Sequence, residues 1–217
     1  MDTARARTNM IDNQLRTNRI DDSRVLEAMG SVPRELFLPK TFHGVAYADE
    51  DLILPNGEFL LEPLVFARLL QAAAIGGDDV VLVVGCDTGY AAAVISKLAA
   101  TVIFVQQSDD VAARIQPVLD EMEADNVVTS VHADPASGDP SQAPFDAVVV
   151  IGAVGRVPEA LIDQLNDDGR LVAVEGGGRV GRGVVVTKIH GVAARRELFD
   201  ASVPALRHIE SPVEFAF

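Results

Sequence analysis

The sequence is poor in cysteine, in long apolar runs and in basic residues, and the first two shortages each exclude a class of protein. Cys86 is the only cysteine among 217 residues, which excludes an intramolecular disulfide and a cysteine-based zinc site. The strand-like apolar run at 80–84 is short, and no run approaches the roughly 20 residues that a membrane-spanning helix needs. The first 15 residues contain no apolar stretch typical of a secretory signal. We therefore expect a soluble, cytoplasmic protein.

Basic residues are outnumbered by acidic ones. The chain has 18 lysines and arginines against 32 aspartates and glutamates, which gives a net charge of −14 and a pI near 4.6. A field of this sign repels nucleic-acid phosphate and disfavours anionic membrane surfaces, so we expect no nucleic-acid and no membrane partner. A well-solvated acidic surface explains the charge, and a preference for cationic partners or a salty cytoplasm is the alternative.

Turn signals and apolar runs divide the chain into two parts. Residues 2–45 predict polar helices, one of which ends at Gly30, and residues 46–62 are typical of an irregular or hairpin-like segment. Pro63 opens a predicted helix that continues to about residue 74. From residue 78 onward, strands and helices alternate. The expected strands are 80–85, 101–106, 127–133, 145–153, 169–175, 183–189 and 195–203, and the expected helices are 90–100, 109–123 and 158–165.

This alternation predicts an α/β fold with a doubly wound, mainly parallel seven-stranded sheet and an N-terminal helical elaboration. The last two strands are expected to be antiparallel neighbours. No internal repeat or low-complexity linker is visible, so we expect one domain over residues 1–217, with the elaboration at 1–75 and the sheet core at 76–217. Ligands of such sheets bind beyond the carboxyl ends of the strands, where the strand order reverses.

Glycines in the loop that follows the first strand allow a close approach of the backbone to a ligand. This loop, GCDTGY at 85–90, has the spacing of neither a dinucleotide fingerprint nor a P-loop. The second glycine cluster, at 176–183, predicts a mobile loop or turn between late strands. Cys86 is expected to be a small buried filler, and Tyr90 to anchor the helix that follows the loop, although it could also face a ligand. The histidines share no ligand spacing, so no metal site is expected at His43, His132, His190 or His208.

Five segments occur in the order found in one known family. They are MIDNQLR at 10–16, VLEAMGSVPRELFLP at 25–39, AYADEDLILPNGEFLLEP at 46–63, VLVVGCDTGYAAAVIS at 81–96 and APFDAVVVIGAVGRVPEALIDQLNDDGRLVAVEG at 143–176. In these segments the chain resembles the protein-L-isoaspartate O-methyltransferases, up to about residue 190. The resemblance implies a class I methyltransferase fold that binds S-adenosylmethionine at the carboxyl edge of the sheet. It also implies methyl transfer to isoaspartyl carboxylates of damaged proteins, with a protein or peptide as substrate.

The resemblance also implies where the cofactor binds, and this chain departs from the family at several of those positions. Asp87 stands where the family has glycine, and its charge would meet the carboxylate of the cofactor. Gln106 replaces an acidic residue that grips both ribose hydroxyls, so the charge-assisted strength is lost. Pro135 replaces a glycine and offers no backbone N–H. The implied cofactor-binding positions are Gly85, Asp87, Gly89, Gln106, Asp134 and Pro135.

The substrate-loop positions of the family are changed as well. They are occupied here by Phe59, Leu60, Leu61 and Glu62, which lose two hydroxyls and turn a neutral amide into a carboxylate. A carboxylate about 4 Å from that of the substrate would cost roughly 1 to 4 kcal/mol. The alternative is that Glu62 is favoured by the start of the helix at Pro63 and that the three apolar residues pack against the sheet.

Three hypotheses follow from the resemblance and its departures. The first is an active methyltransferase that acts on isoaspartyl carboxylates. The second is a family member that has lost catalysis and works as a binding or regulatory module, because the changes coincide at cofactor and substrate positions. The third is a methyltransferase with a more apolar acceptor, which the sequence FLLE at 59–62 favours.

Overall fold

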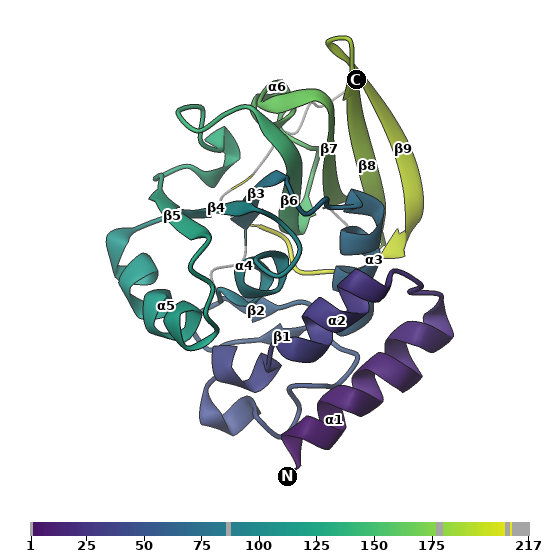
Figure 1. Cartoon of the computed structure of the whole chain (residues 1–217), viewed down its shortest axis with the longest axis vertical. Helices are drawn as coiled ribbons and strands as arrows, with labels where there is room; N and C mark the ends of the chain where they lie inside the picture. The colour runs from purple at the N-terminus through teal and green to yellow at the C-terminus, as the bar shows by residue number, and fades with distance from the viewer. Residues whose placement is uncertain (1, 86–87, 177–179, 207–208, 210–217) are drawn as a thin grey trace, which may run out of the picture.

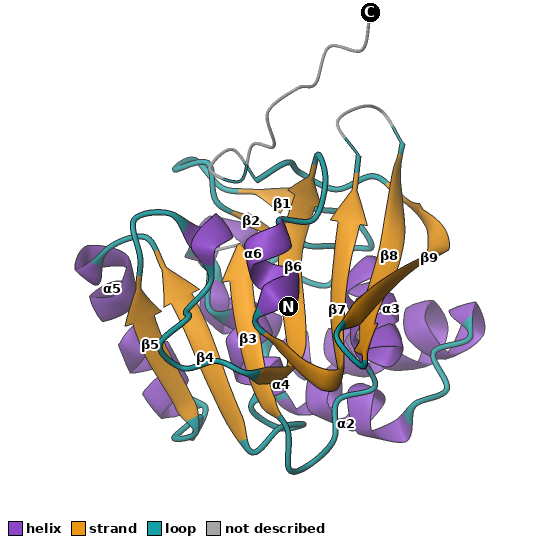
Figure 2. Ribbon diagram, turned by 90° about the horizontal axis from the view of Figure 1, so that it is seen from above, coloured by secondary structure: helices purple, strands orange, loops and turns teal. Residues whose placement is uncertain are grey.

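A seven-stranded sheet forms the centre of the molecule. The computed structural model describes residues 2–85, 88–176, 180–206 and 209. The strand order is β5-β4-β3-β6-β7-β8-β9 (Figure 2). The five strands β3 to β7 are parallel to one another, whereas β8 is antiparallel to both of its neighbours, β7 and β9. The sheet strands are β3 (Val80–Gly85), β4 (Thr101–Gln106), β5 (Val127–Val131), β6 (Phe145–Val154), β7 (Leu165–Glu175), β8 (Gly181–Ile189) and β9 (Val192–Ala201). The predicted α/β fold class is confirmed.

Two apolar layers cover the faces of this sheet. The larger layer joins one face to the N-terminal segments and to α3, α4 and α5, and the smaller one packs α6 on the opposite face (Figures 1 and 2). The helices are α1 (Thr3–Asn9), α2 (Ser23–Ser31), α3 (Pro63–Ala73), α4 (Tyr90–Ile95), α5 (Asp109–Glu121) and α6 (Glu159–Asp163). Short 3₁₀ and π turns complete the N-terminal part and the loop after β5: η1 (Met10–Leu15), η2 (Arg16–Asn18), η3 (Arg34–Phe37), η4 (Lys40–Phe42) and η5 (Pro135–Ser137).

The expected hairpin-like segment is a two-stranded antiparallel ribbon. Its strands are β1 (Leu52–Ile53) and β2 (Phe59–Leu60), joined by a turn that contains Gly57 at φ +87°. Glu58, which directly precedes β2, forms an ion pair with Arg114 of α5, with Nη1 and Oε2 3.0 Å apart. The ribbon is therefore held against the helix that follows β4.

Several expected boundaries are wrong by a few residues. The helix expected over 90–100 ends at Ile95, because Ser96 Oγ turns back to donate to the Ala93 carbonyl at 2.8 Å and residues 96–100 form turns. The strand expected from residue 169 begins at Leu165, whose pairing with Phe145 extends β7 past a register shift. Gly30 does not end its helix, which continues through Ser31. The strand expected at 127–133 and the helices expected at 109–123 and 158–165 each end two residues earlier than predicted.

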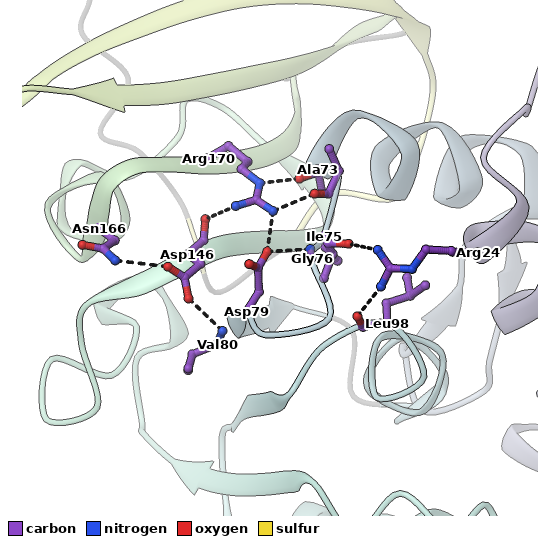
Figure 3. A network of polar contacts seen from close by, with 11 residues as sticks. Arg24, Ala73, Ile75, Gly76, Asp79, Val80, Leu98, Asp146, Asn166 and Arg170 are labelled. Carbon is purple, nitrogen blue, oxygen red and sulfur yellow. Dashed lines mark hydrogen bonds and ion pairs between the residues drawn. The ribbon is translucent and has the colours of Figure 1, made fainter.

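A polar network joins the amino ends of the strands to the end of α3. Arg170 of β7 donates to the carbonyls of Ala73 and Asp146 at 2.5 and 3.0 Å and forms an ion pair with Asp79 (Figure 3). Asp79 in turn accepts the Gly76 N–H at 2.8 Å. Arg170 thus joins β7 to the end of α3 and to the turn before β3, so the network fixes α3 against the sheet.

Within the described part of the chain, none of the helices is both long and apolar enough to cross a membrane. The middle of the glycine cluster at 176–183 lies outside the described residues. Gly181 and Gly183 belong to β8, where Gly183 pairs with Val174 of β7 and Gly181 with Ala201 of β9.

Candidate functional site

The strand order reverses at β3: the chain continues to β4 on one side of β3 and later to β6 on the other side. Gly85 ends β3 at φ +120°, and a Cβ placed there would lie 2.4 Å from the Ile151 carbonyl oxygen. No other residue fits that backbone without moving β6. The chain therefore leaves the sheet at the point where the ligands of such folds bind.

Gly89 and Tyr90 return the chain from this loop into α4. Gly89 has φ +84°, and a Cβ there would lie 2.5 Å from Ile115 Cγ2 of α5, so the loop passes close under that helix. Tyr90 is 2% exposed and its ring packs against Phe37 and Phe66, with centroids 5.5 and 5.6 Å away. Tyr90 therefore anchors α4 to η3 and α3, whereas the sequence suggested the 85–90 loop as its contact. Cys86 and Asp87 lie outside the described residues.

Gln106 ends β4 at the same edge and is fully buried. Its Nε2 donates to the Val105 carbonyl at 3.1 Å, whereas its Oε1 has no hydrogen-bond partner among the described residues. A buried carbonyl oxygen without a partner is costly, so this atom is suited to accept a hydrogen bond from a ligand hydroxyl. The His132 N–H donates to the Gln106 carbonyl at 2.8 Å, which brings the segment before Asp134 beside β4.

Asp134 and Pro135 form the start of η5, beyond the carboxyl end of β5. The exposed Asp134 side chain accepts the Ala136 N–H at 3.0 Å and caps this short turn, and Pro135 is buried. One oxygen of Asp134 is thus engaged by its own turn, and the carboxylate stays accessible from solvent.

The 59–62 loop lies over the carboxyl end of β6. Phe59, Leu60 and Leu61 are 5%, 3% and 2% exposed and belong to the larger apolar layer. A Cβ placed on Gly152 would lie 2.9 Å from Phe59 Cζ, so the small residue in β6 makes room for the aromatic ring. These three side chains pack on the sheet, as the alternative interpretation of the sequence expected.

The sequence offered the interpretation that the start of α3 favours the negative charge of Glu62, and the surroundings of this carboxyl act in the opposite direction. Burial, together with the neighbouring charges of Asp51 and Asp49, raises its pKa to about 7, although Arg68 opposes the shift. The Glu62 N–H donates to Asp51 Oδ1 at 2.8 Å. The Leu64 N–H in the first turn of α3 donates to Asp49 Oδ1 at 3.4 Å, so two other carboxylates bind the amides at this helix start. Burial and the charges of Asp51 and Asp49, which precede β1, thus act against the favourable effect of the helix start on this carboxylate.

Arg34 is a residue of this site that the sequence did not single out. It lies in η3, is fully buried, and donates from Nε to the Ala46 carbonyl at 2.6 Å and from Nη2 to the Leu61 carbonyl at 2.8 Å. Its Cζ lies 5.0 Å from the centre of the Tyr90 ring. Arg34 thus joins the 59–62 loop to the helix that follows the 85–89 loop. Nothing in a single sequence distinguishes such an arginine from a surface one, apart from its position in the segment at 25–39.

The comparisons with known proteins agree on one family. A sequence model of the protein-L-isoaspartate(D-aspartate) O-methyltransferases matches residues 5–195. The chain belongs to this family. It is 40% identical over 194 residues to the protein-L-isoaspartate O-methyltransferase of Koribacter versatilis, which covers 89% of this chain and 87% of the relative. It is 42% identical over 183 residues to a protein-L-isoaspartate O-methyltransferase 2 of an Anaeromyxobacter species, which covers 84% and 75% of the two chains.

A solved structure shares the fold. The chain superimposes with a TM-score of 0.78 on a Plasmodium falciparum structure, described as that of a protein-L-isoaspartate O-methyltransferase in complex with S-adenosyl-L-homocysteine. The match covers 93% of this chain and 98% of that one at 20% identity, and it shows the fold alone. The methyl donor of the family is S-adenosylmethionine. The family resemblance of the sequence and the implied fold are confirmed.

Proposed function

We propose that the chain transfers a methyl group from S-adenosylmethionine to the carboxylate of isoaspartyl residues in proteins. The observation that carries this proposal is the membership of the family over residues 5–195. The geometry supports it, because the 59–62 loop, the 85–89 loop and Gln106 all lie at the carboxyl edge of the sheet. The family acts on protein substrates, so a damaged protein or a peptide is the substrate that we infer.

The residues at this edge fit the cofactor. Gly85 and Gly89 keep the loop free of side chains where the backbone is most crowded, and the unpartnered Gln106 Oε1 offers an acceptor for a ribose hydroxyl. Asp134 offers a carboxylate at the end of the neighbouring strand, although Pro135 adds no N–H beside it. When bound, S-adenosylmethionine supplies the methyl group and leaves as the thioether S-adenosylhomocysteine.

The protein needs no general base for such a transfer. A substrate carboxylate is already ionised at pH 7, so alignment and exclusion of water provide the rate enhancement. Phe59, Leu60 and Leu61 are buried in the larger apolar layer, which fixes the loop that carries Glu62. A Glu62 carboxyl with a pKa of about 7 is partly protonated at neutral pH. In its protonated form Glu62 does not repel the substrate carboxylate and resembles the neutral amide that the family has there.

The two alternative functions are weaker. Nothing in the comparisons favours a member without catalysis, and the site offers the buried Gln106 acceptor and the glycines at positions 85 and 89. A more apolar acceptor has one observation in its favour, the apolar side chains at 59–61. Their burial against the sheet weakens it, because they leave little apolar surface for a ligand.

A two-step experiment tests the proposed function. Calorimetric titration with S-adenosylhomocysteine is expected to show one site, and no binding at millimolar ligand would refute both methyltransferase hypotheses. Methyl transfer is then measured to an isoaspartyl peptide and to the same peptide with normal aspartate. Transfer to the isoaspartyl peptide alone supports the proposal. Binding with transfer to neither peptide would contradict it and is the result expected of a different acceptor or of a member without catalysis.

A further inference from the structure

The most unusual polar side chain of the described residues is Arg34. It is 0% exposed, and among the described residues no carboxylate lies within ion-pairing distance of its guanidinium. Its Nη1 atom has no hydrogen-bond partner there either. Burying a cation without a counterion is costly, so a residue that keeps this arrangement needs a compensating role.

The contacts of Arg34 indicate what that role is. Its Nη2 holds the carbonyl of Leu61, which directly precedes Glu62, and its Nε holds the carbonyl of Ala46 at the start of the segment that leads into the ribbon. The guanidinium carbon lies over the ring of Tyr90, the first residue of α4, at 5.0 Å from the ring centre. One side chain therefore fixes the positions of both loops that the proposed reaction uses.

The charge of Arg34 also acts on Asp51, the carboxylate that accepts the Glu62 N–H. Burial raises the pKa of Asp51, and the Glu62 N–H and the positive charge of Arg34 both oppose that shift. Asp51 is the side chain that holds the Glu62 backbone at 2.8 Å. Because Asp49 and Asp51 lie beside Glu62 of the 59–62 loop, a buried positive charge near Asp51 offsets part of the repulsion that an anionic substrate meets there.

We propose that Arg34 is a positioning residue for the acceptor: it sets the distance between the 59–62 loop and the start of α4. This inference rests on the proposed function for its meaning in catalysis, but the positioning itself is independent of any reaction. It predicts that loss of the guanidinium impairs use of the acceptor far more than it impairs binding of the cofactor.

The chain contains a matched control for this role. Arg24 of α2 also holds two carbonyls, with Nη1 2.6 Å from the Ile75 oxygen and Nη2 2.6 Å from the Leu98 oxygen, but it does so at the amino edge (Figure 3). Arg34→Lys and Arg24→Lys each keep the charge and replace a two-nitrogen clamp by a single ammonium. Because Arg24 is exposed and Arg34 is buried, the KM of each variant is compared with its own midpoint of urea unfolding.

The experiment compares three readouts in the wild type and in both lysine variants. For Arg34→Lys we expect the KM for an isoaspartyl peptide to rise about tenfold or more, with the Kd for S-adenosylhomocysteine changed less than about threefold. We expect faster amide exchange at residues 60–62 in this variant alone. For Arg24→Lys we expect a lower midpoint of urea unfolding and an unchanged KM. Equal KM changes in the two variants would overturn the proposal.

The exchange measurement separates this proposal from the proposed function. If the wild type transfers no methyl group, the proposed function fails, and the exchange at 60–62 still decides the positioning role. Unchanged exchange at these amides in Arg34→Lys would overturn that role whatever the activity. If Arg34→Lys does not fold, Arg34→Gln, which keeps one donor, is measured in the same way and judged by the same two outcomes.

Discussion

The two edges of the sheet treat polar side chains in opposite ways. At the amino edge, Arg170, Asp79, Asp146 and Arg24 bind partners from α3, β3, β7 and the turn after α4 (Figure 3). At the carboxyl edge, three buried polar atoms have no partner among the described residues: Arg34 Nη1, Tyr90 Oη and Gln106 Oε1. The fourth such atom, Gln14 Oε1, belongs to the N-terminal segment.

This contrast indicates that the polar side chains of the amino edge stabilise the fold and that those of the carboxyl edge serve ligand binding. A satisfied network contributes to the free energy of unfolding, and its loss leaves buried groups unpaired. Unsatisfied atoms and a carboxyl whose pKa is raised to about 7 are costs to the folded state, and such costs gather where a ligand binds. Four substitutions test this division, in order of decreasing effect.

The largest effect is expected at Asp79. Asp79→Ala removes the ion pair with Arg170 and the acceptor of the Gly76 N–H, so the free energy of unfolding should fall by about 2 to 4 kcal/mol. Urea unfolding measures this loss. The neighbouring Asp78 is exposed, and Asp78→Ala should change the stability by less than about 0.5 kcal/mol. A loss of S-adenosylhomocysteine affinity in the folded Asp79→Ala protein would contradict the division.

Gln106 is expected to behave in the opposite way. Gln106→Leu removes the unpartnered oxygen, so the stability should change by less than about 1 kcal/mol, whereas the Kd for S-adenosylhomocysteine should rise about tenfold. Titration calorimetry measures the affinity. Asn126 provides the control, because its amide is satisfied by the carbonyls of Ser96 and Ala99 at 2.9 and 3.0 Å. Asn126→Leu should lose stability and keep the affinity, and the reverse pattern would refute the account.

Glu62 gives the site a pH dependence. Its pKa of about 7 lies above the ordinary value of 4.5, so the folded state holds the proton more tightly than the unfolded state does. The stability therefore falls as the pH rises from about 4.5 to 7, and the full cost is present above pH 7. Glu62→Gln should raise the free energy of unfolding by about 1 to 2 kcal/mol at pH 8 and leave it unchanged at pH 4. Equal effects at both pH values would show that the carboxyl does not titrate in this range.

The smallest effect is expected at the ion pair of Glu58 and Arg114. The Arg114 side chain is 48% exposed, so Arg114→Met should cost less than about 1 kcal/mol, and the cost should shrink in high salt. A double-mutant cycle with Glu58→Gln isolates the pair. A coupling above about 2 kcal/mol would mean that the ribbon is held to α5 far more firmly than a surface pair allows.

The sequence predicts the strands better than the site. The apolar runs of β3 and β6 identify buried parallel strands because both faces of the sheet are covered, and Pro63 fixes the start of α3. Gly85 and Gly89 are also predictable, since a loop after a buried strand needs their φ values. The division of the chain at residues 75 and 76 stays a prediction, as do the roles of Asp87 and Asp134.

The electrostatics of the site are not predictable from the sequence. Glu62 precedes a proline-started helix, and the local rule expects a favoured charge, but its pKa depends on Asp49 and Asp51, which the ribbon folds back onto the same helix turn. Arg34 is fully buried only because η3 places it under Tyr90 and the 59–62 loop. Both facts depend on contacts between segments that local patterns do not encode.

Amide hydrogen exchange with and without saturating S-adenosylhomocysteine tests the division between the two edges most directly. The account predicts new protection at the carboxyl edge, in residues 85–90, at Gln106 and in the turn that begins at Asp134. It predicts no change at the amino edge, in residues 73–80 and 166–170. Protection that is confined to the amino edge, or a bound ligand that protects neither edge, would contradict it.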